Sequence, residues 1–505
     1  MNQIRKGSLI SYTAIFLNIA AGLIYTPWMI REIGADNYGL FALIGAFLSY
    51  FTIDFGLGSA IARFISKARA EGDENRVAEL ISTTTRIYLI IDLFIALALT
   101  ISFLFLPTVF STFSPVEMTK FKVIYCIAGL FSLLNFSFMP QNGILIAYEK
   151  FVVLKSCDMV QKLSVVIAMT TAILCGYGLY ALVFINGLIA LIVSIFKFIY
   201  INKETNIKVE IKTYNRDLAR QLFNFSVWIF IITIAQRLLL NIAPTLLGMR
   251  SDIIQISIFS IGMTLETYTW TFAAALNGLF LSRVARISTK ERGSRHEMNC
   301  LMVKVGRVQL MVIGFIICAL IILGRRFINL WMGETFDDSY IVALCLITPG
   351  IIRLTQEIAN SLLMIKNEVK YRAWLYISSS IVCVVIGYAL APSMGAIGVA
   401  LGVFIALIIC HVIGMNIVYF KVLRLDIIGF FKKVHLSMII PMILSSLLSS
   451  FLIYLHPIDS WFAFIAQGII FTVIYYVSMW ILSFNEYEKS LFRSLLSSIT
   501  SNIIK

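Results

Sequence analysis

The chain of 505 residues is 59% hydrophobic and only 13% charged, and it carries a net charge of +14. Its mean hydropathy of +0.90 lies far above that of a soluble domain, which excludes the soluble classes of protein and makes a bilayer the natural solvent of the chain. In such a chain, basic residues indicate membrane topology rather than nucleic-acid binding.

Apolar runs recur along the whole length, and about 20 residues at 1.5 Å each are enough to cross roughly 30 Å of hydrocarbon. The first run is too long for a signal peptide and is therefore predicted to be a membrane helix. The sequence predicts an all-α membrane protein with about 14 transmembrane helices. The predicted spans are 8–30, 38–66, 83–106, 121–146, 154–177, 179–201, 222–247, 254–282, 301–323, 339–365, 374–392, 395–418, 436–455 and 461–483.

Lys and Arg residues gather in alternate loops, and the positive-inside rule then predicts that the N and C termini are cytoplasmic. The predicted location is the bacterial inner membrane, which the chain crosses many times. We expect the basic loops to set topology and to attract anionic lipid headgroups. The longest external loops, 107–120 and 324–338, are too short for an external catalytic domain.

An internal repeat is indicated by landmarks that recur at a near-constant spacing, such as Thr26-Pro27 with Ala243-Pro244, and Gly178 with Gly395. Two six-helix halves would enter the membrane from the same side and form a parallel repeat around a cavity. The alternative is chance similarity between apolar segments. The predicted domains are an N-lobe at 1–201, a basic cytoplasmic linker at 202–221, a C-lobe at 222–420, and two further helices with a cytoplasmic tail at 421–505.

Ionisable and polar side chains inside the predicted spans are candidate functional residues, because charges are costly within a membrane. The cations predicted to bind substrate are Arg237, Arg353 and Arg63. The acids predicted to bind a coupling ion or to pair with cations are Glu266, Glu357, Asp54 and Asp92. The polar residues predicted to line the cavity are Asn18, Gln236 and Asn241.

Each of these interpretations has a structural alternative. Arg353 and Glu357 are four residues apart, hence on one helical face, where they can pair with each other or with a ligand. Structural pairing between helices is the alternative for Arg237, Arg353 and Glu266, and Asp54 can simply lock its helix to a neighbour beside two glycines. Arg307 is expected to reach the interface and to contribute to topology.

Neither catalysis nor a bound cofactor is predicted. The sequence lacks a Walker A loop, an HExxH motif and a GxSxG motif, and its eight cysteines include no CxxC pair, so neither a disulfide framework nor a metal site is predicted. Without a nucleotide site, transport energy would have to come from an ion gradient or from the substrate. H⁺ and Na⁺ are the candidate coupling ions if a gradient drives transport, and no other cofactor is predicted.

Two segments carry a resemblance to a known family. Residues 24–66 contain Ile33-Gly34, Tyr38-Gly39-Leu40-Phe41, and Asp54-Phe55-Gly56-Leu57-Gly58 followed by Arg63; the second segment is Trp331-Met332-Gly333-Glu334-Thr335-Phe336. They resemble Wzx-type polysaccharide flippases of the multidrug/oligosaccharidyl-lipid/polysaccharide (MOP) exporter superfamily.

The resemblance implies two six-helix lobes plus two helices, and a substrate that is an undecaprenyl-diphosphate-linked oligosaccharide, such as an O-antigen repeat unit of lipopolysaccharide, moved to the periplasmic leaflet. It implies cationic cavity residues, for which Arg237 and Arg353 are the best matches in type and depth, and possible partners in a polysaccharide polymerase and a chain-length regulator. Fixed guanidinium groups suit a diphosphate on physical grounds as well, because their forked donors match phosphate oxygens.

Three alternatives remain open from the sequence. A multidrug exporter of the same superfamily would favour twelve helices and an acid-dominated cavity. A lipid II flippase is only weakly distinguished by sequence. A membrane polysaccharide polymerase or ligase belongs to a different class and would need a large external loop, which the chain lacks.

Overall fold

A computed structural model of the protein describes residues 19–205, 215–277, 281–288, 294–366, 368–486 and 488–490. Regular secondary structure within these ranges is entirely helical, which confirms the predicted all-α class. The described residues include ten segments that are long and apolar enough to cross a membrane. The total of fourteen spans stays a prediction, as does the side of the membrane on which each terminus lies.

The described residues belong to two compact units. The first draws on Met1–Ser260 and Tyr376–Gly402, and the second on Ile261–Leu375 and Val403–Lys505. These units divide the chain differently from the predicted lobes, because the helix after the predicted linker belongs to the first unit.

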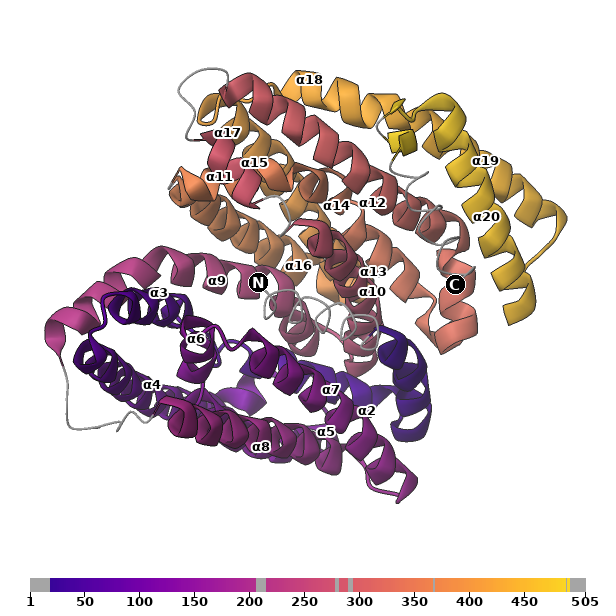
Figure 1. The fold of residues 1–505 in the computed structure, drawn as a ribbon. Helices are drawn as coiled ribbons and strands as arrows, with labels where there is room; N and C mark the ends of the chain where they lie inside the picture. The colour runs from indigo at the N-terminus through magenta and orange to yellow at the C-terminus, as the bar shows by residue number, and fades with distance from the viewer. Residues whose placement is uncertain are drawn as a thin grey trace, which may run out of the picture. The chain divides into compact units, whose positions relative to one another are not determined.

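The first unit begins with a helix over residues 19–33 and continues with helices that are mostly long enough to span a bilayer. Its elements, labelled in Figure 1, are α2 (Ala35–Leu48), α3 (Leu57–Ala70), α4 (Glu74–Val109), α5 (Pro115–Phe136), α6 (Pro140–Ala147), α7 (Phe151–Leu174), α8 (Leu179–Thr205), α9 (Arg216–Arg250), the start of α10 (Ile253–Asn277) and the middle of α16 (Val369–Ala406). Before α7, Lys150 hydrogen-bonds Glu204 of α8, and this contact raises the pKa of Lys150.

The predicted span 38–66 is not one continuous helix, because the chain breaks between α2 and α3. Gly56 has φ 71° and Phe55 has φ 51°, so both adopt a left-handed backbone that no α-helix can include. The Asp54 carboxylate then accepts a hydrogen bond from the Gly58 N–H at 3.0 Å, and so satisfies a backbone donor in the first turn of α3. Discontinuous helices of this kind are typical of transporters.

A second break separates two predicted spans. The apolar segment Val369–Lys421 would be about 80 Å long as one straight helix, far more than a bilayer needs. Gly395, with φ 51°, interrupts it within α16, at the first residue of the predicted span 395–418 and just after the predicted span 374–392. The side chain of Gln255 accepts the Ala396 N–H at 2.9 Å, so the interrupted backbone is hydrogen-bonded within the first unit.

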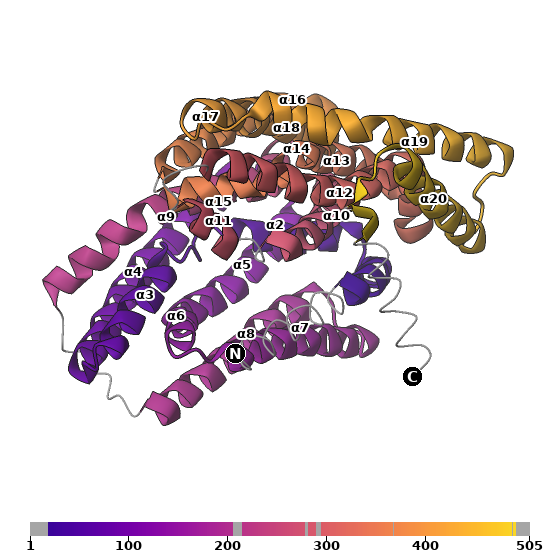
Figure 2. The same ribbon diagram turned by 45° about the horizontal axis from the view of Figure 1, so that its top comes forward.

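The second unit contains the rest of α10 and α16 together with the C-terminal helices. Its other elements are α11 (Leu281–Ser288), α12 (Ser294–Met332), η1 (Glu334–Phe336), α13 (Asp338–Ile347), α14 (Gly350–Arg353), η2 (Leu354–Gln356), α15 (Glu357–Ile365), η3 (Leu407–Gly414), α17 (Met415–Lys421), α18 (Ile427–Phe431), η4 (Lys432–Leu436), α19 (Ser437–Leu455) and α20 (Trp461–Leu482). Figure 2 shows α19 and α20 side by side. The predicted span 339–365 is thus interrupted as well, at α14 and η2.

The core of the second unit forms where α12 packs against α19 and α20. Phe430, Met438 and Tyr475 are fully buried there. The outer faces of α19 and α20 instead expose large apolar side chains, such as Leu447 and Ile481. Exposed apolar surface on this scale marks contact with a membrane or with another protein, and the first of these agrees with the predicted membrane class.

Two segments of this unit, η3 and η4, are π-helices, in which hydrogen bonds run from residue i to i+5. π-Helical segments are rare in proteins, and many of those that occur lie at functional sites. The first of them contains the buried His411.

Candidate functional site

A cluster of charged and aromatic side chains lies inside the second unit at the end of α14. Arg353 Nη2 is 3.5 Å from Glu266 Oε1, and the Arg353 Cζ lies 4.9 Å from the ring centroid of Trp270. Both partners are on α10, one helical turn apart. The side chain of Arg353 is 15% exposed and that of Glu266 is 13% exposed, so the pair is largely shielded from solvent.

The guanidinium of Arg353 is incompletely hydrogen-bonded. Its contact with Glu266 is a single long one rather than a bidentate pair, and its Nε is buried without a hydrogen-bond partner among the described residues. A buried donor without a partner costs about 1–3 kcal/mol. An anion that approached Arg353 would therefore gain contacts that the protein itself does not supply.

The predicted proximity of Arg353 and Glu357 on one helical face is lost. The 3-10 segment η2 separates the two residues, and at three residues per turn a spacing of four no longer keeps side chains on one face. The Glu357 carboxylate instead accepts a hydrogen bond from Asn360 Nδ2 at 3.1 Å. Glu357 is therefore tied to its own helix.

Two further polar residues near this cluster were missed by the sequence reasoning. His411 is 4% exposed and lies within electrostatic range of Arg353. Gln356 is buried and donates to Asn416 Oδ1 of α17 at 2.7 Å. The available signal was the presence of polar residues within apolar runs. Their partners lie about 60 residues away in sequence, so only the fold brings them together.

The predicted polar residues of α9 belong to the first unit. Arg237 is half-buried and makes no hydrogen bond or ion pair with any described residue, although it lies within electrostatic range of Tyr50. Gln236 and Asn241 are also half-buried on the same helix. Asn18 lies outside the described residues.

The remaining predicted acids are held by hydroxyl groups. Asp54, at the break before α3, accepts a hydrogen bond from Tyr88 of α4 in addition to the one from Gly58. Asp92 accepts from Ser137, and its other oxygen is buried without a partner among the described residues. Arg63 is exposed on α3.

An ion pair of the first unit between a buried lysine and a half-exposed aspartate was also missed. Lys197 of α8 is 7% exposed, and its Nζ donates to Asp158 Oδ1 of α7 at 3.2 Å and to Asn142 Oδ1 of α6 at 3.1 Å. Charged residues inside the predicted spans 154–177 and 179–201 were the signal that could have found it.

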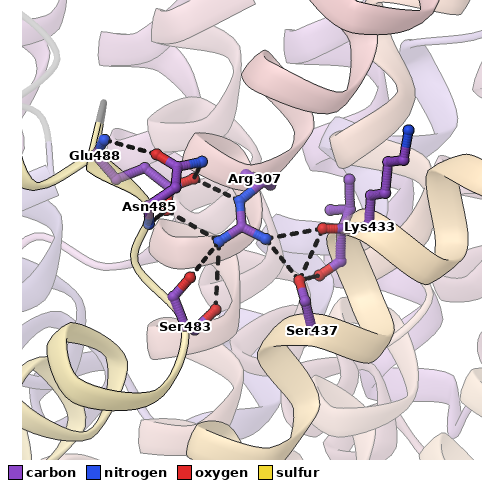
Figure 3. A network of polar contacts seen from close by, with 7 residues as sticks. Arg307, Lys433, Ser437, Ser483, Asn485 and Glu488 are labelled. Atoms are coloured by element: carbon purple, nitrogen blue, oxygen red, sulfur yellow. Dashed lines mark hydrogen bonds and ion pairs between the residues drawn. The ribbon is translucent and has the colours of Figure 1, made fainter.

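Arg307, which was expected to extend toward the membrane interface, is instead held among protein groups. Arg307 is 7% exposed and lies at the centre of the network in Figure 3. It forms a bidentate pair with Glu488 and donates to Ser437 Oγ and to the carbonyl oxygens of Lys433 and Ser483. The network joins α12 to the start of α19 and to the chain after α20.

Metal ligation finds no support in the part of the chain that the structure describes. No group of three or more His, Cys, Asp or Glu side chains within those ranges could hold a metal ion.

Comparison with solved structures identifies the fold. A lipid II flippase in an inward closed conformation matches with a TM-score of 0.68 and 16% identity, covering 97% of this chain and 100% of the other. An inward-facing multidrug resistance MATE family transporter of the MOP superfamily matches with a TM-score of 0.63 and 12% identity, covering 81% of this chain and 96% of the other. A eukaryotic MATE transporter matches with a TM-score of 0.57 and 14% identity, covering 82% and 96%. No curated protein sequence matches significantly.

Broken membrane helices, polar clusters buried within apolar helices and these structural matches define the class: a multi-pass helical membrane protein with the fold that lipid II flippases and MATE transporters share. Within that class, residues 4–278 match the model of the polysaccharide biosynthesis protein family, and the chain belongs to this family.

Proposed function

We propose that the protein is a flippase that moves an undecaprenyl-diphosphate-linked oligosaccharide from the cytoplasmic to the periplasmic leaflet of a bacterial inner membrane. Membership of the polysaccharide biosynthesis protein family supports a substrate from this chemistry. Transport would proceed by alternating access coupled to H⁺ or Na⁺. A polysaccharide polymerase and a chain-length regulator are the partners proposed to take up the product.

The observation that carries this proposal is the incomplete hydrogen bonding of Arg353. Its single 3.5 Å contact with Glu266 leaves donors that a diphosphate can accept, and the shielded position strengthens such charge-assisted bonds. Trp270 holds the guanidinium by a cation–π contact and so orients it without saturating its donors. Arg237, which has no ion partner among the described residues, is the second proposed cation.

The test is transport of the lipid-linked oligosaccharide in proteoliposomes that contain the full chain. Arg353→Ala should lower the transport rate about 10- to 100-fold, because a hydrogen bond to a charged group contributes about 1.5–3 kcal/mol. Arg353→Lys should retain part of the activity, because it keeps the charge but loses the forked donors. Arg325→Ala is the matched control, since Arg325 is 67% exposed and pairs with Asp337. Equal losses in Arg353→Ala and Arg325→Ala would refute the role of Arg353.

The same assay tests ion coupling at Glu266. Glu266→Gln keeps an oxygen that can accept from Arg353 but cannot exchange a proton. We expect its transport rate to lose its dependence on an imposed ion gradient. A gradient dependence like that of the wild type would exclude Glu266 as the coupling acid.

A lipid II flippase is the second candidate function. The supporting observation is the share of this chain that each structural match covers. The match to the solved lipid II flippase covers 97% of this chain, whereas the matches to the two MATE transporters cover 81% and 82%. Both candidate substrates carry a diphosphate, so Arg353 would serve either. Competition between lipid II and the oligosaccharide substrate in the proteoliposome assay separates the two candidates.

A further inference from the structure

A group of three lysines lies among α6, α7 and α8 of the first unit, which pack beside one another (Figure 2). Its members are Lys155 and Lys162 of α7 and Lys197 of α8. The charge pattern of the sequence predicts that α7 begins and α8 ends on the cytoplasmic side. All three lysines fall inside the predicted spans 154–177 and 179–201, where a charged residue is costly and marks a candidate functional site.

Lys197 is held in a fixed position by two neighbouring helices. It is 7% exposed, and its Nζ donates to Asn142 Oδ1 of α6 at 3.1 Å and to Asp158 Oδ1 of α7 at 3.2 Å. A lysine ammonium group has three N–H donors. One donor of Lys197 is therefore left without a partner among the described residues.

The positive charge of this group exceeds the negative charge beside it. Asp158 and Glu204 are the only acidic residues in the sequences of α6, α7 and α8. Glu204 already pairs with Lys150. The other oxygen of Asp158 lies 3.8 Å from Lys155 Nζ, which is beyond hydrogen-bonding distance. Lys162 makes no ion pair with any described residue. One carboxylate thus faces three ammonium groups.

Lys162 faces away from the apolar outer side of α7. Val160 and Ile167, which are 51% and 65% exposed, mark that side. At about 100° per residue, Lys162 lies about 40° from Asp158 around the helix but about 140° or more from both apolar residues. Lys162 is nevertheless exposed. A charged side chain on the inner side of a membrane helix is expected to meet a water-filled cavity, so an anion would reach Lys162 from water.

The lysines also differ in depth. Lys155 is the second residue of the predicted span 154–177, and Lys162 lies about 10 Å deeper along the helix. The phosphates of resident bilayer lipids stay in the headgroup region, outside the hydrocarbon. Lys162 is therefore better placed for a phosphate that enters the protein below that region than for a resident phospholipid.

We propose that Lys155, Lys162 and Lys197 form an anion site of the first unit that binds the diphosphate head of a polyprenyl-linked lipid arriving from the cytoplasmic side. The choice of a polyprenyl carrier rests on the function proposed above, whereas the anion site rests on the three lysines. An ammonium group binds phosphate as a point charge on a flexible stem, which suits a head group that is bound in passing.

The experiment measures lipid binding to the purified full chain in detergent by native mass spectrometry, with undecaprenyl diphosphate or phosphatidylglycerol added. Undecaprenyl diphosphate should bind in preference to phosphatidylglycerol. Lys155→Gln and Lys162→Gln should each weaken its binding about fivefold, as expected for the loss of one basic residue near an anionic lipid head. Neither lysine is buried, so both variants are expected to fold. Equal binding of phosphatidylglycerol would assign the site to a resident lipid and overturn the proposal.

Asp158→Asn separates ligand binding from a purely structural role of the lysines. Asparagine keeps an oxygen that can accept from Lys197 but removes the negative charge that competes with the ligand. We expect undecaprenyl diphosphate to bind several-fold more tightly to this variant. Binding that is unchanged or weaker, in a variant whose thermal midpoint shows it to be folded, would contradict the anion site.

Lys203→Gln is the matched control, because Lys203 is exposed near the end of α8 and its replacement removes the same charge. It should bind undecaprenyl diphosphate like the wild type, and equal weakening would show a diffuse surface attraction instead of a site. The result is independent of the transport assay. Intact binding without transport would refute the proposed function alone, whereas wild-type binding by Lys155→Gln and Lys162→Gln would refute this site alone.

Discussion

Arg307 and Arg353 belong to the same compact unit but differ in how completely their guanidinium groups are hydrogen-bonded. Arg307 uses every donor, whereas Arg353 has one long contact and a buried Nε without a partner among the described residues. A saturated arginine holds helices together, and an unsaturated one can exchange its partner for a ligand. The hydrogen-bond pattern therefore distinguishes the structural cation from the candidate substrate cation.

Arg307 and Glu488 form a buried ion pair. For such a pair, replacing one partner should lower the free energy of unfolding more than replacing both. Arg307→Met should destabilise the protein by about 3–5 kcal/mol, because Glu488 is left buried without a counter-charge. The double variant Arg307→Met/Glu488→Met should recover most of this loss. Chemical denaturation in detergent measures the free energy of unfolding of both variants. A double variant that is less stable than Arg307→Met would contradict the prediction.

The sequence could identify these arginines as unusual but could not assign their roles. Both are isolated cations in or near apolar runs, and depth along the helix alone predicted that Arg307 reaches the interface. Its actual partners lie 130 and 181 residues further along the chain. Pairing over such separations depends on tertiary packing, which hydrophobic periodicity does not encode.

At the scale of the elements, apolar runs predicted where helices occur but not where they break. The residues of the break before α3, Asp54-Phe55-Gly56, were noticed for packing and family resemblance, although Gly56 serves a left-handed backbone. Likewise, the periodicity over 339–365 conceals the 3-10 turn that moves Glu357 off the face of Arg353. A window of hydropathy averages over such local changes.

Gly56→Ala tests the importance of the break. Alanine would be strained at φ 71°, and its Cβ would lie 2.8 Å from Ile229 Cβ. We expect a loss of about 2–4 kcal/mol from the strained backbone and the overpacking together. Gly45→Ala in α2 is the control, because a Cβ there meets nothing within 4 Å, and it should be neutral or stabilising by up to about 1 kcal/mol. Equal thermal midpoints for the two variants would show that the break tolerates a side chain.

At the scale of the whole molecule, composition and the recurrence of apolar runs were sufficient to predict an all-α membrane protein. The resemblance to polysaccharide flippases came instead from two short segments, and the chain belongs to the polysaccharide biosynthesis protein family. The predicted lobes followed sequence repeats, whereas the compact units follow packing and assign Arg216–Arg250 to the first unit. A repeat records similarity between segments, and packing depends on which neighbours each segment buries.

The orientation of the chain in the membrane is a property of the whole molecule, and it can be predicted from the basic residues. The segment η4, which directly precedes α19, carries Lys432 and Lys433, whereas the turn after the end of α19, around Asp459, carries no Lys or Arg. The positive-inside rule therefore places Lys432 in the cytoplasm and Asp459 outside. In a cysteine-free background, a membrane-impermeant maleimide should label Asp459→Cys but not Lys432→Cys in intact cells. Inverted vesicles should reverse the pattern, and the opposite result in cells would reverse the topology.

The π-helix over Leu407–Gly414 has a consequence for how the chain tolerates deletion. Each of its hydrogen-bonded rings contains one residue more than an α-helical ring, so the segment can lose a residue such as Ile409 and rewind as α-helix. Deleting Ile381 from the straight part of α16 would instead rotate every later side chain by about 100° relative to its neighbours. The segment around His411 is thus the place in this long apolar stretch where a shortened chain can still fold.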